Sequence, residues 1–413
     1  MPLLSTKPLV ETVPADGATR CGRAPLKKTQ VDFDFAYEAG DELKVRDPAR
    51  DLMLNLLFIT TILLSDPGLG PASETLLVAS TRSNTVTLLD AEEGEHQLTL
   101  RLGGGPGEMA ISPDGSVAVV AIPGDEVAGD SIGVIDLAHQ SLMRTIKLEG
   151  PSPGLGEGTQ VFWRPRGVAF LPDGDTVLVV SETAGALLVI SLERAEIIAS
   201  TSTGGTLPQR VVLSPDGRFA FVSNQGSGTI GVINLSRRRL EKTIDVGGGP
   251  SAMALTPDEQ QLWVANRESN SISLIQLESQ SVLVEFPCGS QPSALTFTSD
   301  GAHALCTNMS SGNISIFDVS THKPVGEIEL PRVSAAVAEQ RPGPKGARVG
   351  RSCLPTSLII APGSKRGWVA MKRLDAVAEL NLSDWSVIRT FPVGAEPSKL
   401  VWSRKPSTQV QAK

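Results

Sequence analysis

Three features of the sequence predict an all-β fold, a closed ring of seven four-stranded blades. Seven prolines recur at spacings of 59, 43, 42, 42, 63 and 42 residues: Pro106, Pro165, Pro208, Pro250, Pro292, Pro355 and Pro397. Apolar residues stand three and five positions after each proline, the period-two pattern of a strand with one buried face. An Asp-containing turn sequence, such as SPDG at 112–115, follows in five copies and leads into another apolar segment.

The copy that starts at Pro208 shows the elements in order. Residues 211–213 form the end of the innermost strand, and the SPDG turn leads into a second strand at 219–224. A third strand follows at 230–235 and a fourth at 241–246. Four short antiparallel strands that repeat at this spacing are typical of a β-propeller blade, which needs neighbouring blades to cover its faces.

The two ends of the repeat region complement each other. The last copy stops after its innermost strand at 396–403, and residues 76–102 supply the three strands that this copy lacks. We therefore predict six complete blades and a seventh shared between the N-terminal and C-terminal segments. Such sharing closes the ring and removes an exposed strand edge.

The repeat unit, seen best at Gly204–Leu235, Gly247–Leu277 and Gly289–Val319, resembles the YVTN-type β-propeller repeat of exported bacterial and archaeal proteins. The resemblance covers residues 76–403, although the signature tyrosine is absent, with Phe219, Leu262 and Trp263 in its neighbourhood. It implies a seven-bladed propeller and leaves the function open, because propellers support unrelated activities.

The N-terminal 73 residues do not follow the repeat. We expect residues 1–52 to be a disordered or misassigned N-terminal extension and residues 53–73 to be a signal peptide. Leu52–Leu64 is a short apolar run followed by Asp-Pro-Gly and small residues, as in secretory signals. The alternative is a cytosolic protein with a disordered tail and a packed apolar helix. The propeller is then 74–404, with a tail at 405–413, and we expect a periplasmic or extracellular location.

Composition limits the partners. The net charge of −8 and the pI of about 5.2 argue against a nucleic-acid surface, and after signal removal nothing predicts stable membrane insertion. The four cysteines form no CxxC or CxxCH pattern, so we expect no cofactor. Cys288 and Cys353 precede the prolines of successive blades, and a disulfide between them stays open. We also expect a monomer.

Three insertions mark one face of the predicted ring. They are Ala121–Ser131, between a second and third strand, and Glu149–Arg164 and Pro331–Leu354, between consecutive blades. In an up-and-down blade these connections lie on the same face, here called the mouth. Long loops are usually functional or disordered, and we expect the insertions to form a lid over the central channel.

Basic residues gather at the same mouth. Positions just after the prolines, just after the second strands and within the insertions supply the candidate ligand-binding residues: Glu108, Trp163, Arg164, Arg166, Arg210, Arg267, Arg348, Arg351, Lys372 and Lys399. Arginine forks suit carboxylates and phosphates, and Trp163 could cover an apolar body. The alternative is ordinary surface ion pairing. We expect replacement of Arg166 and Arg210 together to weaken anion binding while thermal stability stays nearly unchanged.

We predict no catalytic and no metal-binding residues. His96, His139, His303 and His322 fall in turns on the opposite face, so none could act as a base at the mouth. Oxygen ligands for a cation could come from Glu108, Glu182, Asn224, Asn266 and Asn308, but recurrence of the asparagines at 42 residues favours loop capping. We therefore predict an exported, non-catalytic propeller that binds an anionic small ligand or a protein partner. The alternatives are a metal-assisted, lactonase-like hydrolase and a protein-interaction scaffold.

Overall fold

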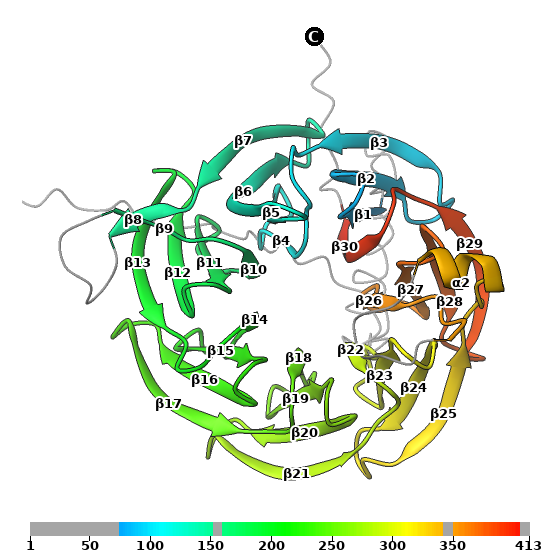
Figure 1. The fold of residues 1–413 in the computed structure, drawn as a ribbon. Coiled ribbons are helices and arrows are strands. Elements are labelled where there is room, and N and C mark those ends of the chain that lie inside the picture. The colour runs from blue at the N-terminus through cyan, green and yellow to red at the C-terminus, as the bar shows by residue number, and fades with distance from the viewer. Residues whose placement is uncertain (1–73, 152–158, 342–349, 405–413) are drawn as a thin grey trace, which may run out of the picture. The chain divides into compact units, whose positions relative to one another are not determined.

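Seven antiparallel sheets of four strands surround a central channel in the computed structural model, which describes residues 74–151, 159–341 and 350–404 (Figure 1). This confirms the predicted all-β, seven-bladed fold. The predicted extension, signal peptide and C-terminal tail lie outside the described residues.

Each blade runs from an innermost to an outermost strand, and we number the blades I to VII. Blade I contains β4 (Met109–Ile111), β5 (Val117–Gly124), β6 (Ala128–Asp136) and β7 (Ser141–Lys147). Blade II contains β10 (Pro165–Phe170), β11 (Thr176–Ser181), β12 (Ala186–Ser191) and β13 (Glu196–Ser202). Blade III contains β14 (Pro208–Leu213), β15 (Phe219–Asn224), β16 (Thr229–Asn234) and β17 (Arg239–Asp245).

The remaining blades repeat this order. Blade IV contains β18 (Pro250–Leu255), β19 (Gln261–Asn266), β20 (Ser271–Gln276) and β21 (Ser281–Pro287). Blade V contains β22 (Pro292–Phe297), β23 (His303–Asn308), β24 (Asn313–Asp318) and β25 (Pro324–Glu329). Blade VI contains β26 (Pro355–Ile360), β27 (Arg366–Met371), β28 (Ala376–Asn381) and β29 (Ser386–Pro392).

Blade VII joins the two ends of the propeller, as predicted. The C-terminal strand β30 (Pro397–Arg404) is innermost and pairs with β1 (Glu74–Ser80), which is followed by β2 (Thr85–Asp90) and β3 (His96–Arg101). Buried Glu379 of β28 strengthens this closure, because its carboxylate lies 2.6 Å from Nε of both Arg366 and Arg389. These two arginines donate hydrogen bonds to carbonyl oxygens of the β2–β3 turn, at 91–93.

Burial differs between strands because of their position in the ring. The second and third strands lie between neighbouring blades, so nearly every side chain of β19 is buried. The outermost strands face solvent on one side, and β29 alternates between exposed and half-buried residues. Separate apolar clusters fill the spaces between blades, as in the cluster of β11 and β12 with β15.

A β-bulge at the start of the innermost strands shapes the channel wall. Pro208 pairs with Asn224 and Arg210 with Ser223, so Gln209 is an extra residue in the register. Blades II, IV, V and VI show the same shift. Consecutive strand residues normally face opposite sides, and the bulge allows both Gln209 and Arg210 to line the channel.

Glycines before the prolines pack against asparagines at the ends of the second strands. A Cβ atom on Gly247 would lie 2.5 Å from Nδ2 of Asn266, and one on Gly205 would lie 2.6 Å from Cβ of Asn224. Asn266 is buried and donates hydrogen bonds to Ser271 and Ser273. The recurring glycine and asparagine therefore join consecutive blades.

The described parts of the two long insertions do not form the predicted lid. The strands β8 (Glu149–Pro151) and β9 (Thr159–Val161) pair with each other, and β8 packs against β13, the outermost strand of blade II. The helix α2 (Ala335–Gln340) is seen in front of β28 and β29 in the view of Figure 1. Arg341, directly after α2, pairs with Asp375 and donates to the carbonyl oxygens of Lys372 and Arg373. These contacts attach the described parts of the insertions to blade II and to the mouth loop of blade VI; the central parts, 152–158 and 342–349, lie outside the described residues.

Candidate functional site

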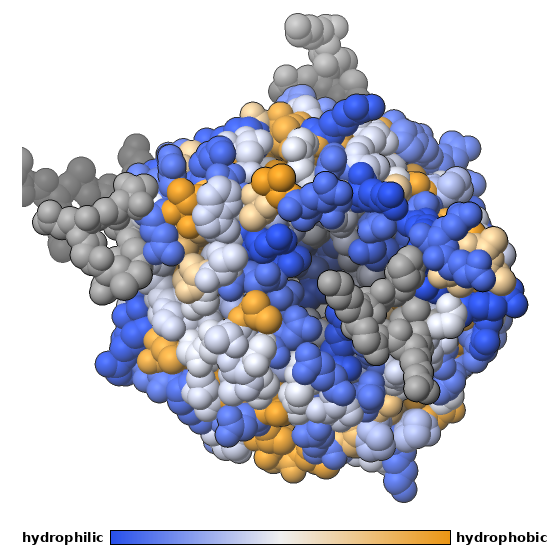
Figure 2. All heavy atoms as spheres, viewed as in Figure 1, coloured by the Kyte–Doolittle hydropathy of each residue, from blue (hydrophilic) through white to orange (hydrophobic). Residues whose placement is uncertain are grey.

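A cavity of about 280 Å³, here called the mouth pocket, opens at the channel end that carries the insertions, and all seven blades line it. Figure 2 shows mostly hydrophilic residues around the hollow at the centre of this face. Two positions of the repeat form the wall. One is the pair of residues directly after the proline. The other is the residue 17 positions after the proline, beyond the second strand, as in Gln225, Arg267, Met309 and Lys372.

Hydroxyl groups at the bulge connect consecutive blades. Ser251 Oγ donates to the carbonyl oxygen of Pro292 at 3.0 Å, and Ser293 Oγ donates to that of Pro355 at 2.8 Å. Thr356 and Ser398 make the same bond to the next blade. These side chains serve the scaffold. Blades I, II and III depart from this pattern, with Gly107, Arg166 and Gln209 at the position.

Three charged side chains meet below the mouth pocket, and we call them the charge triad. Glu108 forms ion pairs with Arg210 and with Lys399, whose Nζ lies 2.9 Å from Oε2. Arg210 Nε also donates to the carbonyl oxygen of Ser251 at 3.2 Å. Burial lowers the pKa of Arg210 to about 10, and burial together with Arg210 lowers the pKa of Lys399.

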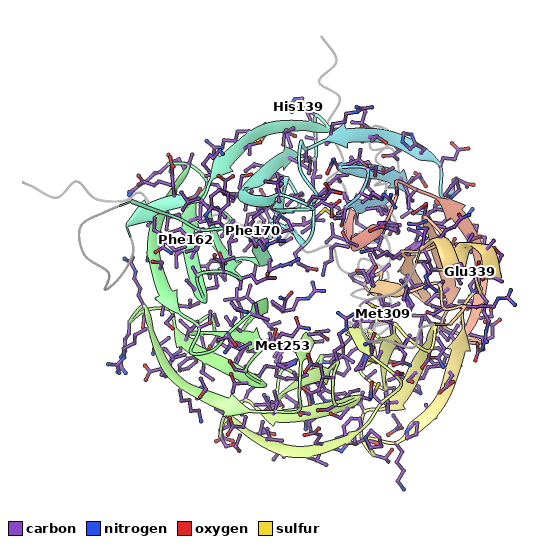
Figure 3. The ribbon with its side chains drawn as sticks, viewed as in Figure 1. His139, Phe162, Phe170, Met253, Met309 and Glu339 are labelled. Carbon is purple, nitrogen blue, oxygen red and sulfur yellow. The ribbon has the colours of Figure 1, made fainter. Side chains whose placement is uncertain are left out.

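The charge triad separates two cavities. Glu108 and Arg210 line both the mouth pocket and a second chamber of about 190 Å³, which Lys399 also lines. The residues that line this chamber come largely from the innermost strands and include Val211, Met253 and Leu295. Figure 3 labels Met253 and Met309 near the channel. The triad therefore lies between the mouth pocket and this inner chamber.

Glu182 holds a second group at the mouth. Arg166 Nε lies 2.6 Å from Oε2 of Glu182, and Gln209 Nε2 donates to the same oxygen at 3.1 Å. Lys372 pairs with Glu396 at 3.1 Å, and Glu396 also lies within 4 Å of Arg341 and Arg82. Carboxylates of the protein thus already pair with most of the basic side chains at the mouth.

Arg267 differs from the other cations of the pocket. It is partly buried, and its Nη2 lies 3.2 Å from the thioether sulfur of Met309. Burial lowers its pKa, against a smaller opposing effect of Glu268. Within residues 74–151, 159–341 and 350–404, Arg267 forms no ion pair. Its guanidinium is therefore partly removed from water and keeps hydrogen-bond donors free in the wall of the pocket.

The structure brings together part of the predicted set. Glu108, Arg166, Arg210, Arg267 and Lys372 line the mouth pocket, and Lys399 lines the chamber below. Trp163, Arg164 and Arg351 are not among the lining residues. Arg351 instead donates to the carbonyl oxygen of Val333 within its own insertion, and Arg348 lies outside the described residues.

Two residues near the mouth have contacts that could not be predicted from their residue types. Met309 occupies the repeat position of Arg267 one blade later, but a thioether gives no sequence signal for a pocket. Arg373, one residue beyond that position in the β27–β28 connection, is buried and donates to the carbonyl oxygens of Arg341, Gly350 and Ser352. The ion pairs argue against the expected independence of stability from Arg166 and Arg210, because removal of both arginines takes the ion-pair partner of Glu182 and one of the two partners of Glu108.

The residues considered as oxygen ligands for a cation make other contacts through their nitrogen atoms or charges. Asn224 and Asn308 are buried like Asn266; Nδ2 of Asn224 donates to the carbonyl oxygen of Thr203 in the preceding inter-blade loop, and Nδ2 of Asn308 donates to Asn313 of its own blade. Glu108 and Glu182 pair with the cations described above. In the part of the chain that the structure describes, no group of three or more His, Cys, Asp or Glu side chains could hold a metal ion.

The histidines and cysteines lie away from the mouth pocket. His303 begins β23, His139 and His322 lie in turns between third and fourth strands, and Figure 3 shows His139 at the outer rim. Cys288 and Cys353 are free thiols rather than a disulfide, and they belong to different apolar clusters. Burial raises the pKa of Cys353 to about 12.

Seven four-stranded antiparallel sheets around a channel define the protein as a seven-bladed β-propeller. Residues 169–342 match the family described as "YNCE-like beta-propeller". The match and the seven blades confirm the predicted resemblance to propeller repeat proteins and are consistent with a YVTN-type propeller.

Similar solved structures support the fold alone, because their sequence identities are low. A functionally unknown protein from Desulfotomaculum acetoxidans aligns with a TM-score of 0.63 at 13% identity, covering 80% of this chain and 99% of its own. Hydrazine synthase from Kuenenia stuttgartiensis gives 0.59 at 17% identity, covering 75% and 98%. A candidate 6-phosphogluconolactonase from Bacteroides fragilis gives 0.60 at 16% identity, covering 80% and 98%.

No curated protein matches the chain. Within the described residues, no helix has the length and apolar character needed to cross a membrane.

Proposed function

We propose that the protein binds a small anionic ligand in the mouth pocket and performs no chemistry on it. The observation that carries this proposal is the state of Arg267. Its guanidinium is partly desolvated, lines the pocket and contacts a thioether instead of a carboxylate. An oxyanion accepts two hydrogen bonds from a guanidinium fork and restores the interactions that desolvation removes.

The surrounding cations support the same ligand. Arg166 and Lys372 also line the pocket, and Arg210 lies at its base. Converging cations in a concave wall raise the local concentration of an anion and favour its binding. An export signal at 53–73 remains part of the proposal, with the periplasm or cell exterior as the location; N-terminal sequencing of the secreted protein tests it.

Calorimetric titration with inorganic phosphate tests the binding. We expect saturable binding to the parent protein and at least about tenfold weaker binding to Arg267→Gln, which lacks one charge-assisted fork. Arg218→Gln is the matched control, because Arg218 lies in a turn of blade III on the opposite face and its side chain is 71% exposed. Equal affinity of the parent and Arg267→Gln for phosphate, or absence of binding by both phosphate and carboxylate anions, would contradict the proposal.

The hydrolase and scaffold alternatives lead to other results. The likeness to a candidate 6-phosphogluconolactonase makes a phosphorylated lactone the natural substrate to try. Consumption of that lactone by purified protein with a stoichiometric divalent cation would favour the hydrolase. Retention of a protein partner by both the parent and Arg267→Gln would favour the scaffold.

A further inference from the structure

Large exposed apolar side chains are unevenly distributed among the described residues. Five of them lie on outermost strands: Met143, Leu283, Val284, Val325 and Ile388. The other three, Val127, Trp163 and Leu207, lie on mouth connections of blades I, II and III, with exposures of 82%, 41% and 49%. We call these three residues the apolar arc.

Each residue of the apolar arc adjoins the wall of the mouth pocket. Val127 lies in the β5–β6 hairpin, whose Pro123 and Gly124 line the pocket. The carbonyl oxygen of Leu207 accepts a hydrogen bond from the lining residue Gln225 at 3.0 Å.

Trp163 is held beside the same wall. Its carbonyl oxygen accepts hydrogen bonds from Ser181 and Thr183, the two neighbours of Glu182, and Glu182 pairs with the lining residue Arg166. The arc therefore borders the pocket over three consecutive blades.

The cation of the mouth pocket without an ion pair among the described residues, Arg267, lies outside these three blades. Arg267 belongs to blade IV and Lys372 to blade VI, with Met309 of blade V between them on the wall. A ligand that reaches Arg267 and extends toward blades I to III passes from a desolvated cation to exposed apolar surface. Exposed apolar side chains beside a pocket mark places where an apolar group can be removed from water.

We propose that the ligand of the mouth pocket is a small organic oxyanion with an apolar body, its head at Arg267 and its body against the apolar arc. This rests on the proposed anion-binding function and specifies the class of ligand. Such a ligand matches the positive charge on one wall and the apolar surface beside the other. An inorganic anion would use only the charge.

Paired probes with and without an apolar body test the inference by calorimetric titration. The pairs are inorganic phosphate with phenyl phosphate, and acetate with phenylacetate. For the head group that binds, we expect the aryl compound to bind about tenfold more tightly than its partner, because the ring loses apolar contact with water. Phenol, which has no anionic head, serves as the probe for the ring alone and should not bind measurably.

A substitution on the arc separates the two parts of the ligand. Leu207 has a φ of 49°, a conformation that asparagine tolerates, so Leu207→Asn removes the apolar surface while the backbone is kept. We expect Leu207→Asn to lose most of the aryl gain without change in phosphate affinity. Leu283→Asn, at an outermost-strand residue that is 55% exposed, should keep the gain.

The outcomes distinguish this inference from the proposed function. Phosphate binding that depends on Arg267, with no tighter binding of either aryl compound, overturns the inference and leaves the function. An aryl gain that survives Leu207→Asn and Val127→Asn places the body elsewhere and also overturns it. Failure of all four anions to bind overturns both.

Discussion

Lys399 Nζ lies 2.9 Å from Oε2 of Glu108, which also pairs with Arg210. The charge triad thus joins side chains of blades VII, I and III across the channel. One carboxylate faces two cations, so Glu108 both stabilises the ring and reduces the positive charge available to a ligand.

Replacement of Glu108 should therefore have opposite effects on stability and binding. Glu108→Gln leaves Arg210 and Lys399 without their shared counter-ion, and we expect a loss of roughly 2 kcal/mol in unfolding free energy, less than for a fully buried pair. Phosphate should bind more tightly, because the two cations become available. Denaturant unfolding and calorimetry measure the two effects. Glu329→Gln, at a 67% exposed residue, is the control and should change neither; parallel losses of stability and affinity would contradict the prediction.

Gly247 should not tolerate a side chain. A Cβ atom there would meet Asn266 at 2.5 Å, so Gly247→Ala should cost roughly 1–3 kcal/mol of stability by overpacking. Addition of Asn266→Ser to Gly247→Ala should recover part of the loss, because Ser80 occupies the equivalent position in blade VII. Gly326→Ala, whose Cβ would have its nearest neighbour at 3.7 Å, should be nearly neutral. Equal effects of the two alanine substitutions in thermal unfolding would refute this account.

Glu379 should control the ring closure. Its side chain is 2% exposed and holds Arg366 and Arg389 against the β2–β3 turn. Glu379→Gln leaves two guanidinium groups with one neutral acceptor, and we expect a loss of about 3 kcal/mol. Hydrogen exchange should accelerate at 91–95 before it accelerates in blade IV. Uniform acceleration in both blades would show a general loss of stability instead.

The stability of the protein should depend on acidic pH through Asp318, at the turn between β24 and β25. Hydrogen bonds from Ser320 and Thr321 lower the pKa of Asp318 to about 2, below its usual value of 3.8. The ionised carboxylate is therefore favoured in the folded state, and its contribution to stability is lost as pH falls from about 4 to about 2. The melting temperature of Asp318→Ala should lie below that of the parent near neutral pH and approach it in this acidic range. A difference that stays constant with pH would disprove the role of the charge.

The sequence was sufficient for the scaffold because the scaffold repeats. Apolar residues at fixed positions after each proline, with an Asp turn between strands, describe a local unit that folds alike in every copy. Ring closure was also readable, since the first and last copies are complementary halves of one blade. Gly247 and Asn266 lie within one repeat length of each other and recur in several copies. The sequence therefore singled out these residues, although it did not show that they touch.

The site depends on what the repeat does not contain. Glu108, Arg210 and Lys399 are far apart in the chain, and only closure of the ring brings them within ion-pair distance. The availability of Arg267 follows from its neighbour Met309 in the next blade, a packing relationship across two repeats. The described parts of the long insertions contact blade surfaces, with β8 against β13 and Arg341 against Asp375, and residue type and length alone did not predict these contacts. Local pattern determined the blades of this protein, and contacts between blades decided which of its charges remain free for a ligand.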